Sequence, residues 1–286
     1  MRVVRKTKEL RELISELKQA GDRIALVPTM GNLHEGHLQL VKVARTHAER
    51  VVATIFVNPT QFGPAEDFGS YPRTPQEDVS ALESVGADIL FMPDVDEVYP
   101  RPLSEMTAVN VPVLSETLCG AFRPGHFKGV ATVVLKLFNM VGPDCALFGE
   151  KDFQQLRVIR QMVTDLNLPI DIHGVPTVRE QSGLAMSSRN AYLSPKERSD
   201  AAKIYETLVT VARGLKYEQV SPEASEAEGL NRLSEAGFNV DYFAVRRAED
   251  LALPVGSDAA ESLVILVAAR LGKARLIDNL KLADLA

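Results

Sequence analysis

Apolar and polar residues recur with helical and strand-like periods along the first part of the chain. Residues 7–21 carry apolar side chains at helical spacing after Thr7, a candidate N-cap, which predicts an amphipathic helix. The apolar run at 23–29 predicts a strand, and a helical period over 36–50 follows it. The β-branched run at 51–59 is typical of a strand buried on both faces. These segments predict a strand–helix–strand unit.

The same alternation continues to about residue 178. Thr74, Pro75 and Glu77 have the spacing of an N-cap, a first-turn proline and a capping-box acid at the start of a helix. Helices are expected at 73–86, 129–143 and 152–167, and strands at 87–93, 145–150 and 170–178. This order predicts an α/β domain with a parallel sheet and helices on both faces, in which ligands bind beyond the carboxyl ends of the strands.

The pattern changes after residue 178. A polar, turn-like stretch precedes a long helix expected at 194–216, which begins with a capping box of Ser194, Pro195 and Glu197. The polar segment 217–229 is expected to be a solvated connection. Strands are expected at 240–251, 262–272 and 273–282. The chain is therefore expected to contain a second, smaller α+β domain.

Composition narrows the class of protein. The 286 residues carry a formal net charge of −6, which argues against a nucleic-acid partner but leaves room for small anions held in a local cationic pocket. The longest apolar run, 263–269, is far shorter than a membrane span, so no membrane partner and a cytoplasmic location are expected. Cys119 and Cys145 are too few for a disulfide framework and are expected to be reduced.

Two of the five histidines lie three residues apart after the first buried-looking strand. Gly31 and Gly36 allow the backbone to approach a ligand, so His34 and His37 would lie at a helix start that favours anions. The alternative is that both histidines only cap the helix or lie on the surface. A zinc site is disfavoured, because the stretch is not H-E-x-x-H and offers no third ligand nearby in sequence, so no metal ligand is named.

The familiar phosphate-binding loops are missing from the sequence. No G-x-G-x-x-G follows the first long strand, and the glycines at Gly120 and Gly125 have Walker spacing but continue with His126 and Phe127. Nucleotide binding, if it occurs, must use another device.

A resemblance suggests that device. H-x-G-H-like and M-S-S-R segments resemble the paired signatures of the nucleotidylyltransferase and class I aminoacyl-tRNA synthetase superfamily. Within it, seven blocks are similar, in order, to the pantothenate synthetase family: PTMGNLHEGH, FVNPTQF, YPRT, RPGHFKGVATVV, FGEKDFQQL, VPTVRE and GLAMSSRNAYL. The chain is identified as a member of that family over nearly its whole length.

The resemblance implies a Rossmann-like ATP- and pantoate-binding domain at 1–177 and a smaller C-terminal lid domain at 178–286. It implies a ligase of coenzyme A precursor biosynthesis that joins (R)-pantoate to β-alanine through pantoyl adenylate, releasing AMP and diphosphate. Mg²⁺ is expected to accompany ATP, with phosphate oxygens and water as its ligands. The family precedent is a homodimer.

The resemblance also implies roles for single residues. His34, His37, Lys151 and Arg189 are the expected catalytic group, acting on phosphate charge. The ATP site is expected to comprise Pro28, Met30, Gly31, His34, His37, Gly149, Lys151, Asp152, Val178, Met186, Ser187, Ser188 and Arg189. Asp152 resembles a residue near the ribose, and its alternative role is the N-cap of the next helix. Lys151 could otherwise be a surface lysine.

Pantoate recognition is expected from a smaller group. Gln61 and Gln155 resemble the pair that holds pantoate, and Gln61 is also expected to contact β-alanine. Asn58, Arg123 and His126 are expected to border the same space, although a structural role for each remains open.

Three other functions compete with this hypothesis. A dinucleotide-forming nucleotidylyltransferase would need a second phosphate subsite, which the glutamine pair does not supply. A non-catalytic nucleotide sensor would be expected to have lost phosphate-contacting residues, yet both histidines, Lys151 and Arg189 are present. An aminoacyl-tRNA synthetase is disfavoured because the chain lacks room for an anticodon domain and is negatively charged.

Overall fold

The structure is a computed structural model that describes residues 1–63, 68–69 and 71–285. Contacts divide the chain into two compact units. The first unit consists of Met1–Glu150 and Gln155–Pro176, and the second of Lys151–Gln154 and Thr177–Ala286. The roles expected for residues 1–177 and 178–286 stay predictions.

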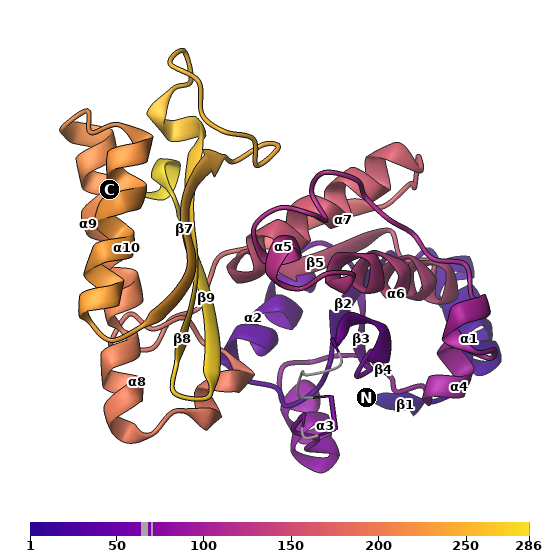
Figure 1. Cartoon of the computed structure of the whole chain (residues 1–286). Coiled ribbons are helices and arrows are strands. Elements are labelled where there is room, and N and C mark those ends of the chain that lie inside the picture. Colours follow the sequence, from indigo (N-terminus) through magenta and orange to yellow (C-terminus); the bar gives the residue numbers. More distant parts are fainter. Residues whose placement is uncertain (64–67, 70, 286) are drawn as a thin grey trace. The chain divides into compact units, whose positions relative to one another are not determined.

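The first unit is built on one parallel sheet with the strand order β1-β4-β3-β2-β5-β6 (Figure 1). Its strands are β1 (Arg2–Val4), β2 (Ile24–Thr29), β3 (Arg50–Ile55), β4 (Ile89–Phe91), β5 (Cys145–Gly149) and β6 (Asp171–Val175). Its helices are α1 (Thr7–Gln19), α2 (Glu35–Ala44), α3 (Pro75–Ser84), α4 (Val95–Val98), α5 (Cys119–Phe122), α6 (His126–Val141) and α7 (Phe153–Asp165).

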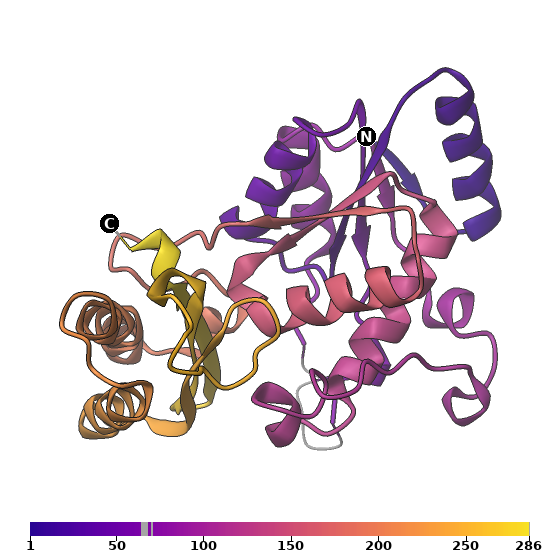
Figure 2. The ribbon, with the colours of Figure 1, turned by 90° about the horizontal axis from the view of Figure 1, so that it is seen from above.

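Burial of both sheet faces explains the continuous apolar strands. Every residue from Ile24 to Val27 in β2 is fully buried. Because side chains alternate along a strand, Ala25 and Val27 face one side, where they pack with Leu40 of α2 and Leu82 of α3. Helices lie on both sides of the sheet, as Figure 2 shows. The α/β fold class predicted from the alternation is confirmed.

Several expected boundaries differ in the first unit. Lys6, not Thr7, is the N-cap of α1, and the Thr7 backbone N–H donates to Glu97 Oε1 at 2.9 Å. Thr74 is the N-cap of α3 and Pro75 its first residue, as expected. The capping box is wrong, because the Thr74 hydroxyl donates to the Asp78 carboxylate at 3.2 Å and does not cap the backbone. The short elements β1, α4 and α5 were not expected, since three or four residues are too few to show a period.

The described residues of the second unit, up to residue 285, form a three-stranded antiparallel sheet in the order β7-β8-β9 and three α-helices. The strands are β7 (Asn239–Arg247), β8 (Leu263–Leu271) and β9 (Ala274–Lys281), and the helices are α8 (Pro195–Ala201), α9 (Lys203–Tyr217) and α10 (Pro222–Glu235). The capping box of Ser194 and Glu197 is confirmed. The long helix expected there is divided at Ala202, whose backbone is still helical.

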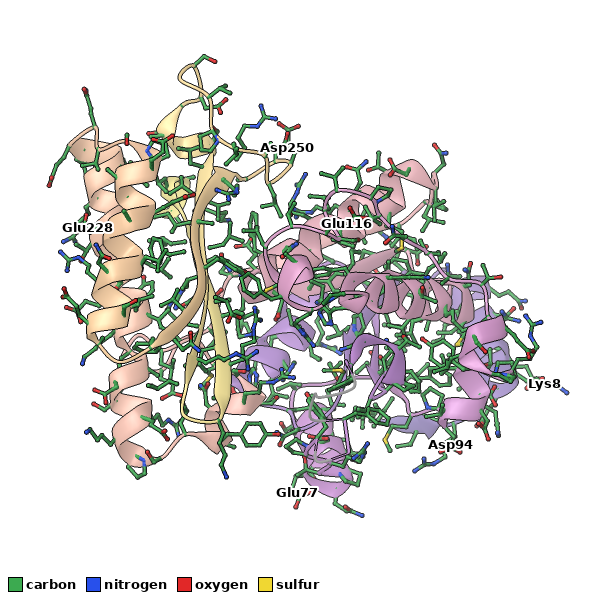
Figure 3. The ribbon with its side chains drawn as sticks, viewed as in Figure 1. Lys8, Glu77, Asp94, Glu116, Glu228 and Asp250 are labelled. Atoms are coloured by element: carbon green, nitrogen blue, oxygen red, sulfur yellow. The ribbon has the colours of Figure 1, made fainter. Side chains whose placement is uncertain are left out.

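The solvated connection expected at 217–229 is wrong, because most of it belongs to α10. Ser221 is the N-cap, and its hydroxyl accepts the Ala224 N–H at 3.3 Å. The buried side of the helix carries small residues at Ser225 and Gly229, so the usual apolar period is hidden. A Cβ at Gly229 would lie 2.4 Å from the Phe243 ring, which shows how closely α10 packs on β7. Glu228, labelled in Figure 3, forms an ion pair with Arg232 on the same helix.

Candidate functional site

The strand order places a topological switch point between β2 and β5. From β2 the chain continues through α2 to β3 on one side, whereas β5 continues through α7 to β6 on the other side. In sheets of this type ligands bind outside the carboxyl ends of the strands at the switch point. The candidate residues 28–37 come from the end of β2, the turn after it and the start of α2, and Gly149 ends β5.

The turn after β2 is held by a buried carboxylate. Asp78 of α3 is 3% exposed and accepts the backbone N–H groups of Asn32 and Leu33 at 2.9 and 2.8 Å. Gly31 has φ +80°, and a Cβ there would lie 3.0 Å from Asp78 Oδ2, so the turn needs glycine at this position. Asp78 was missed in the sequence because no local pattern connects it with a turn more than forty residues earlier.

His34 and His37 form a capping box at the start of α2. His34 Nδ1 accepts the Gly36 N–H at 3.1 Å, and His37 Nδ1 accepts the His34 N–H at 3.3 Å. The ring centroids are 4.1 Å apart. Because each Nδ1 accepts a hydrogen bond, each neutral ring carries its proton on Nε2. Both rings therefore cap the helix, and this contact does not decide whether they also meet a ligand.

The Gln61 side chain lies between two candidate residues. Its Oε1 accepts from Asn58 Nδ2 at 3.1 Å, and its Nε2 lies 2.8 Å from Met30 Sδ. A thioether sulfur is a weak acceptor, so a ligand oxygen could replace it at small cost. This contact joins a residue predicted to bind pantoate with one predicted to bind ATP.

Asn58, Arg123 and His126 hold the segment that carries Gln61. Asn58 is 1% exposed, and its amide nitrogen donates both to Gln61 Oε1 and to the Gly129 carbonyl at 3.2 Å. His126 Nδ1 lies 2.8 Å from the Gln61 carbonyl oxygen, and Arg123 Nη1 lies 3.0 Å from His126 Nε2. These contacts favour positioning of Gln61 over direct contact with a ligand, and the pantoate contacts expected from the three residues stay predictions.

The remaining candidates of the first unit lie along the same strand ends. Pro28 is paired with Thr54 of β3, and Gly149 is paired with Val175 of β6. Gln155 is half-buried in the first turn of α7. Each position agrees with a ligand site at the switch point.

The second unit contains the cationic and hydroxyl candidates. Lys151 Nζ lies 3.4 Å from Asp152 Oδ2, and both residues belong to a 3₁₀ turn. Asp152 directly precedes Phe153, the first residue of α7, so the N-cap role expected for it stays a prediction. The Lys151 carbonyl accepts Asn279 Nδ2 at 3.0 Å. The Lys151 side chain is 18% exposed, which leaves it within reach of solvent and of an anionic ligand.

The polar segment after β6 is a hydrogen-bonded turn. The Val178 carbonyl accepts the Met186 N–H at 3.0 Å, and Ser187 caps a 3₁₀ turn by accepting the Arg189 N–H at 3.3 Å. Asn190, 6% exposed, donates from its amide to Glu180 and to the Ala185 carbonyl, both at 3.1 Å. The loop is therefore fixed by its own hydrogen bonds, and it carries the candidates Met186, Ser187, Ser188 and Arg189.

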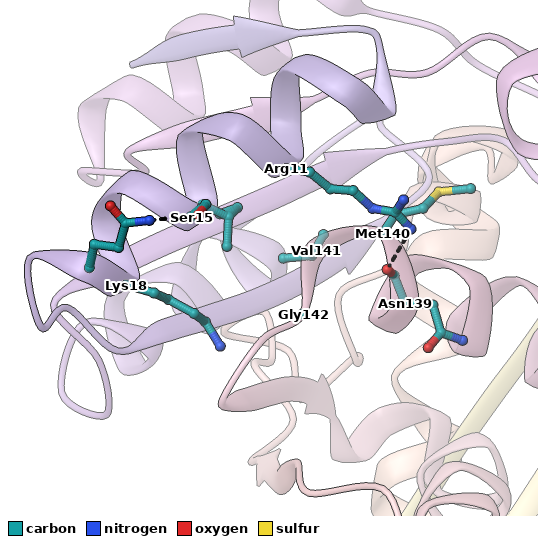
Figure 4. A pocket seen from close by; sticks show the side chains of 9 residues that line it. Arg11, Ser15, Lys18, Asn139, Met140, Val141 and Gly142 are labelled. Carbon is teal, nitrogen blue, oxygen red and sulfur yellow. Dashed lines mark hydrogen bonds between the residues drawn. The ribbon is translucent and has the colours of Figure 1, made fainter.

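A groove of about 470 Å³ between α1 and α6 lies elsewhere in the first unit (Figure 4). Arg11 donates to the Asn139 carbonyl at 3.2 Å, and Lys18 pairs with Asp144 at 3.2 Å. Both helices end here just before β2 and β5 begin, so the groove lies toward the amino ends of those strands, opposite the switch point. It contains none of the candidate residues.

Within residues 1–63, 68–69 and 71–285, no helix combines the length and the apolar character that a bilayer crossing requires. In the same part of the chain, no group of three or more histidine, cysteine, aspartate or glutamate side chains is arranged to hold a metal ion.

Comparison with known proteins identifies the family. The model of the family described as pantoate-beta-alanine ligase matches residues 2–281. A pantothenate synthetase of Methylococcus capsulatus is 56% identical over 279 residues, which cover 98% of this chain and 97% of the relative. The crystal structure of pantothenate synthetase from Thermus thermophilus matches with a TM-score of 0.91 and 45% identity, covering 99% of each chain.

A third relative is described with ligands. The crystal structure of a pantoate-beta-alanine ligase from Francisella tularensis, complexed with beta-gamma ATP and beta-alanine, matches with a TM-score of 0.81 and 33% identity. The match covers 99% of this chain and 98% of that one. By the family model that matches residues 2–281 and by relatives that match nearly its whole length, the chain belongs to the pantoate-beta-alanine ligase family.

Proposed function

We propose that the chain joins (R)-pantoate to β-alanine with ATP, giving pantothenate, AMP and diphosphate. The match over residues 2–281 and relatives above 50% identity support this activity. In the first step a pantoate carboxylate oxygen attacks the α-phosphorus of ATP, and diphosphate leaves. In the second step the β-alanine amine attacks the acyl carbon of pantoyl adenylate and loses a proton, and AMP leaves.

The histidine capping box is the observation that carries the proposal. Both Nδ1 atoms accept backbone N–H groups at the start of α2, so each neutral ring carries its proton on Nε2 at a helix N-terminus. Helix N-termini favour anions through the dipole and the backbone N–H groups. We assign His34 and His37 to the α- and β-phosphates, where preorganised donors stabilise the charge that develops as the bond to diphosphate breaks.

Two cationic and two hydroxyl side chains are assigned the other phosphate contacts in this proposal. Lys151 provides a compact positive charge, and Arg189 can donate two parallel hydrogen bonds to phosphate oxygens. Ser187 and Ser188 provide hydroxyl donors for the same oxygens. The contact of Asp152 with the ribose rests on the family resemblance.

The remaining ATP contacts rest on the same resemblance. We assign them to residues at the strand ends and at the start of the loop: Pro28, Met30, Gly31, Gly149, Val178 and Met186.

Pantoate recognition is assigned to neutral amides. Gln61 and Gln155 can each donate to a carboxylate and accept from a hydroxyl, which suits a small hydroxy acid. The Gln61 amide is held by Asn58, and its weak Met30 contact can be exchanged for a ligand oxygen. Gln61 would also meet β-alanine. Asn58, Arg123 and His126 act in this proposal by fixing Gln61.

Mg²⁺ is part of the substrate in this proposal. The candidate phosphate contacts are mainly imidazole, hydroxyl and cationic groups, which do not form an all-protein magnesium cage. The ion would therefore enter with ATP and remain coordinated by phosphate oxygens and water. A homodimer and a cytoplasmic location complete the proposal, and sedimentation of the purified protein tests the dimer.

The direct test is a reaction of purified protein with MgATP, pantoate and β-alanine, with pantothenate, AMP and diphosphate measured separately. We expect equal amounts of the three products, and no pantothenate when any one substrate is omitted. Formation of AMP without pantothenate in the complete mixture would reject the proposed ligase activity.

A further inference from the structure

A buried ion pair lies at the base of the loop that carries Ser187 and Arg189. Arg179 donates from Nη1 and Nη2 to the two carboxylate oxygens of Asp278, at 2.6 and 3.0 Å. The Asp278 side chain is 3% exposed. A two-bond pair of this kind fixes the orientation of both side chains as well as their separation.

The arginine end of this pair contacts the turn that leads into the loop. The backbone of Arg179 forms an antiparallel β-bridge with that of Ala185, and Arg179 Nη1 donates to the Gly183 carbonyl at 3.1 Å. The guanidinium also stacks 3.7 Å from the centroid of the Tyr205 ring. Since the chain runs directly from Ala185 into Met186, the ion pair sets the point from which the loop departs.

The aspartate end is connected to Lys151 through the next residue of β9. Asp278 and Asn279 are adjacent in the strand, so their side chains leave it on opposite faces. Asn279 Nδ2 donates to the Lys151 carbonyl at 3.0 Å, and the Asn279 N–H donates to Asp278 Oδ1 at 2.8 Å. One short piece of β9 therefore holds both segments to which phosphate contacts are assigned.

A gain in stability does not by itself explain why the Arg179–Asp278 ion pair is buried. Burial raises the pKa of Asp278, and the hydrogen bonds from Arg179 oppose that rise. Replacing a buried ion pair by packed apolar residues is often neutral or stabilising, so a pair that is kept can serve geometry instead. The contacts to Gly183 and Lys151 show which geometry that is.

We propose that Arg179, Asp278 and Asn279 are positioning residues for ATP, which fix the Met186–Arg189 loop and Lys151 in one arrangement on β9. The inference rests on the phosphate roles proposed for those two segments. It predicts that damage to the pair weakens the use of ATP and leaves recognition of pantoate nearly intact, because Gln61 and its supports belong to the other unit.

The test uses two variants and a matched control in the full chain. Asp278→Asn removes the charge at nearly constant size, and Asn279→Ala removes the bond to the Lys151 carbonyl while the ion pair stays. Asp241→Asn is the control, because Asp241 pairs with Arg275 at 2.7 Å in the same sheet and is 9% exposed. Steady-state constants for each substrate are measured, together with calorimetric binding of a non-hydrolysable ATP analogue and thermal melting.

We expect Asp278→Asn and Asn279→Ala to raise KM for ATP and weaken analogue binding by about 10-fold or more, as small misplacements of binding groups do. KM for pantoate should stay within about twofold, and the control should keep all constants near those of the parent. If Asp278→Asn does not fold, Asn279→Ala carries the test. Equal changes for ATP and pantoate, an equal effect in the control, or unchanged ATP binding would overturn the inference. Calorimetry tests the positioning role even if the parent protein makes no pantothenate. Absence of pantothenate would count against the proposed ligase function alone.

Discussion

Gly129 of α6 lies so close to Thr60 that a Cβ built on Gly129 would stand 2.3 Å from the Thr60 carbonyl oxygen. The same Cβ would lie 2.8 Å from the Gln61 nitrogen. These are backbone atoms, so Gly129→Ala must displace the Gln61 segment. We expect kcat/KM for pantoate to fall about 10²-fold, with a smaller loss for ATP, in steady-state assays.

Gly214→Ala is the control for this substitution. A Cβ at Gly214 in α9 would meet its nearest neighbour at 3.4 Å, so the helix can accept alanine there. Its activity should equal that of the parent. A Gly129→Ala protein with unchanged pantoate kinetics would show that the close contact does not position Gln61.

Gln61→Ala should weaken pantoate use much more than ATP use, because the amide partner of the acid is lost while the phosphate contacts remain. Loss of a hydrogen bond to a charged group typically costs about 1.5–3 kcal/mol, which corresponds to roughly 10- to 150-fold in kcat/KM. Gln161→Ala, at an exposed glutamine that donates to Asp165, is the matched control. An equal loss for both substrates would indicate a structural role for Gln61.

His37→Ala should slow single-turnover formation of pantoyl adenylate by about 10²–10³, since one preorganised donor to developing charge is removed. Because the His37 ring also accepts the His34 N–H, we expect a loss of about 1 kcal/mol in the free energy of unfolding. Ser221→Ala removes a comparable helix cap on α10 and should cost similar stability with full activity. Adenylate formation at the parental rate would refute the donor role.

Pantoyl adenylate should form without β-alanine. ATP and pantoate alone are then expected to support exchange of labelled diphosphate into ATP, because the first step is reversible and complete in itself. Radiolabel incorporation with and without β-alanine measures this. Exchange that requires β-alanine would exclude a separate adenylate step.

Stability should fall in mild acid because of His173. Burial, and then the neighbouring His47, lower its pKa from 6.5, and Arg160 and Arg23 act in the same direction while Asp171 opposes them. Above pH 6.5 His173 takes nothing from the free energy of unfolding. Below pH 6.5 the unfolded chain binds the proton first, so the free energy of unfolding declines as pH falls through the folded-state pKa of His173. Melting temperatures between about pH 5 and 8 should fall less steeply for His173→Asn than for the parent. Parallel curves would assign the acid sensitivity to other groups.

Local signals explain what could be predicted from the sequence. The Ser194–Glu197 capping box involves residues three apart, and the buried strands of the first unit are uninterrupted apolar runs. Their order indicated the parallel sheet, and the end of the strand before His34 and His37 indicated those two candidates, whereas the candidates after β5 came from the family resemblance. Helix α10 was missed because small residues on its buried side carry no apolar period.

Long-range contacts explain what could not be predicted from the sequence. Asp78 reaches a turn more than forty residues earlier, and Asn279 reaches a carbonyl 128 residues away. The tautomers of His34 and His37 follow from backbone partners that only the fold reveals. Residue identity could suggest which side chains meet a ligand, but not which side chains hold them in place.

If His34 and His37 act on phosphate charge as proposed, catalysis and the start of α2 depend on the same two positions. A substitution that removes an imidazole also removes a backbone acceptor, so inactive variants arising at these positions would carry a folding defect as well. Serine and glutamate at the same spacing form the common version of this motif and would keep the helix start without either ring donor. An inactive variant of this chain would therefore keep its helix start best if serine and glutamate replaced both histidines together.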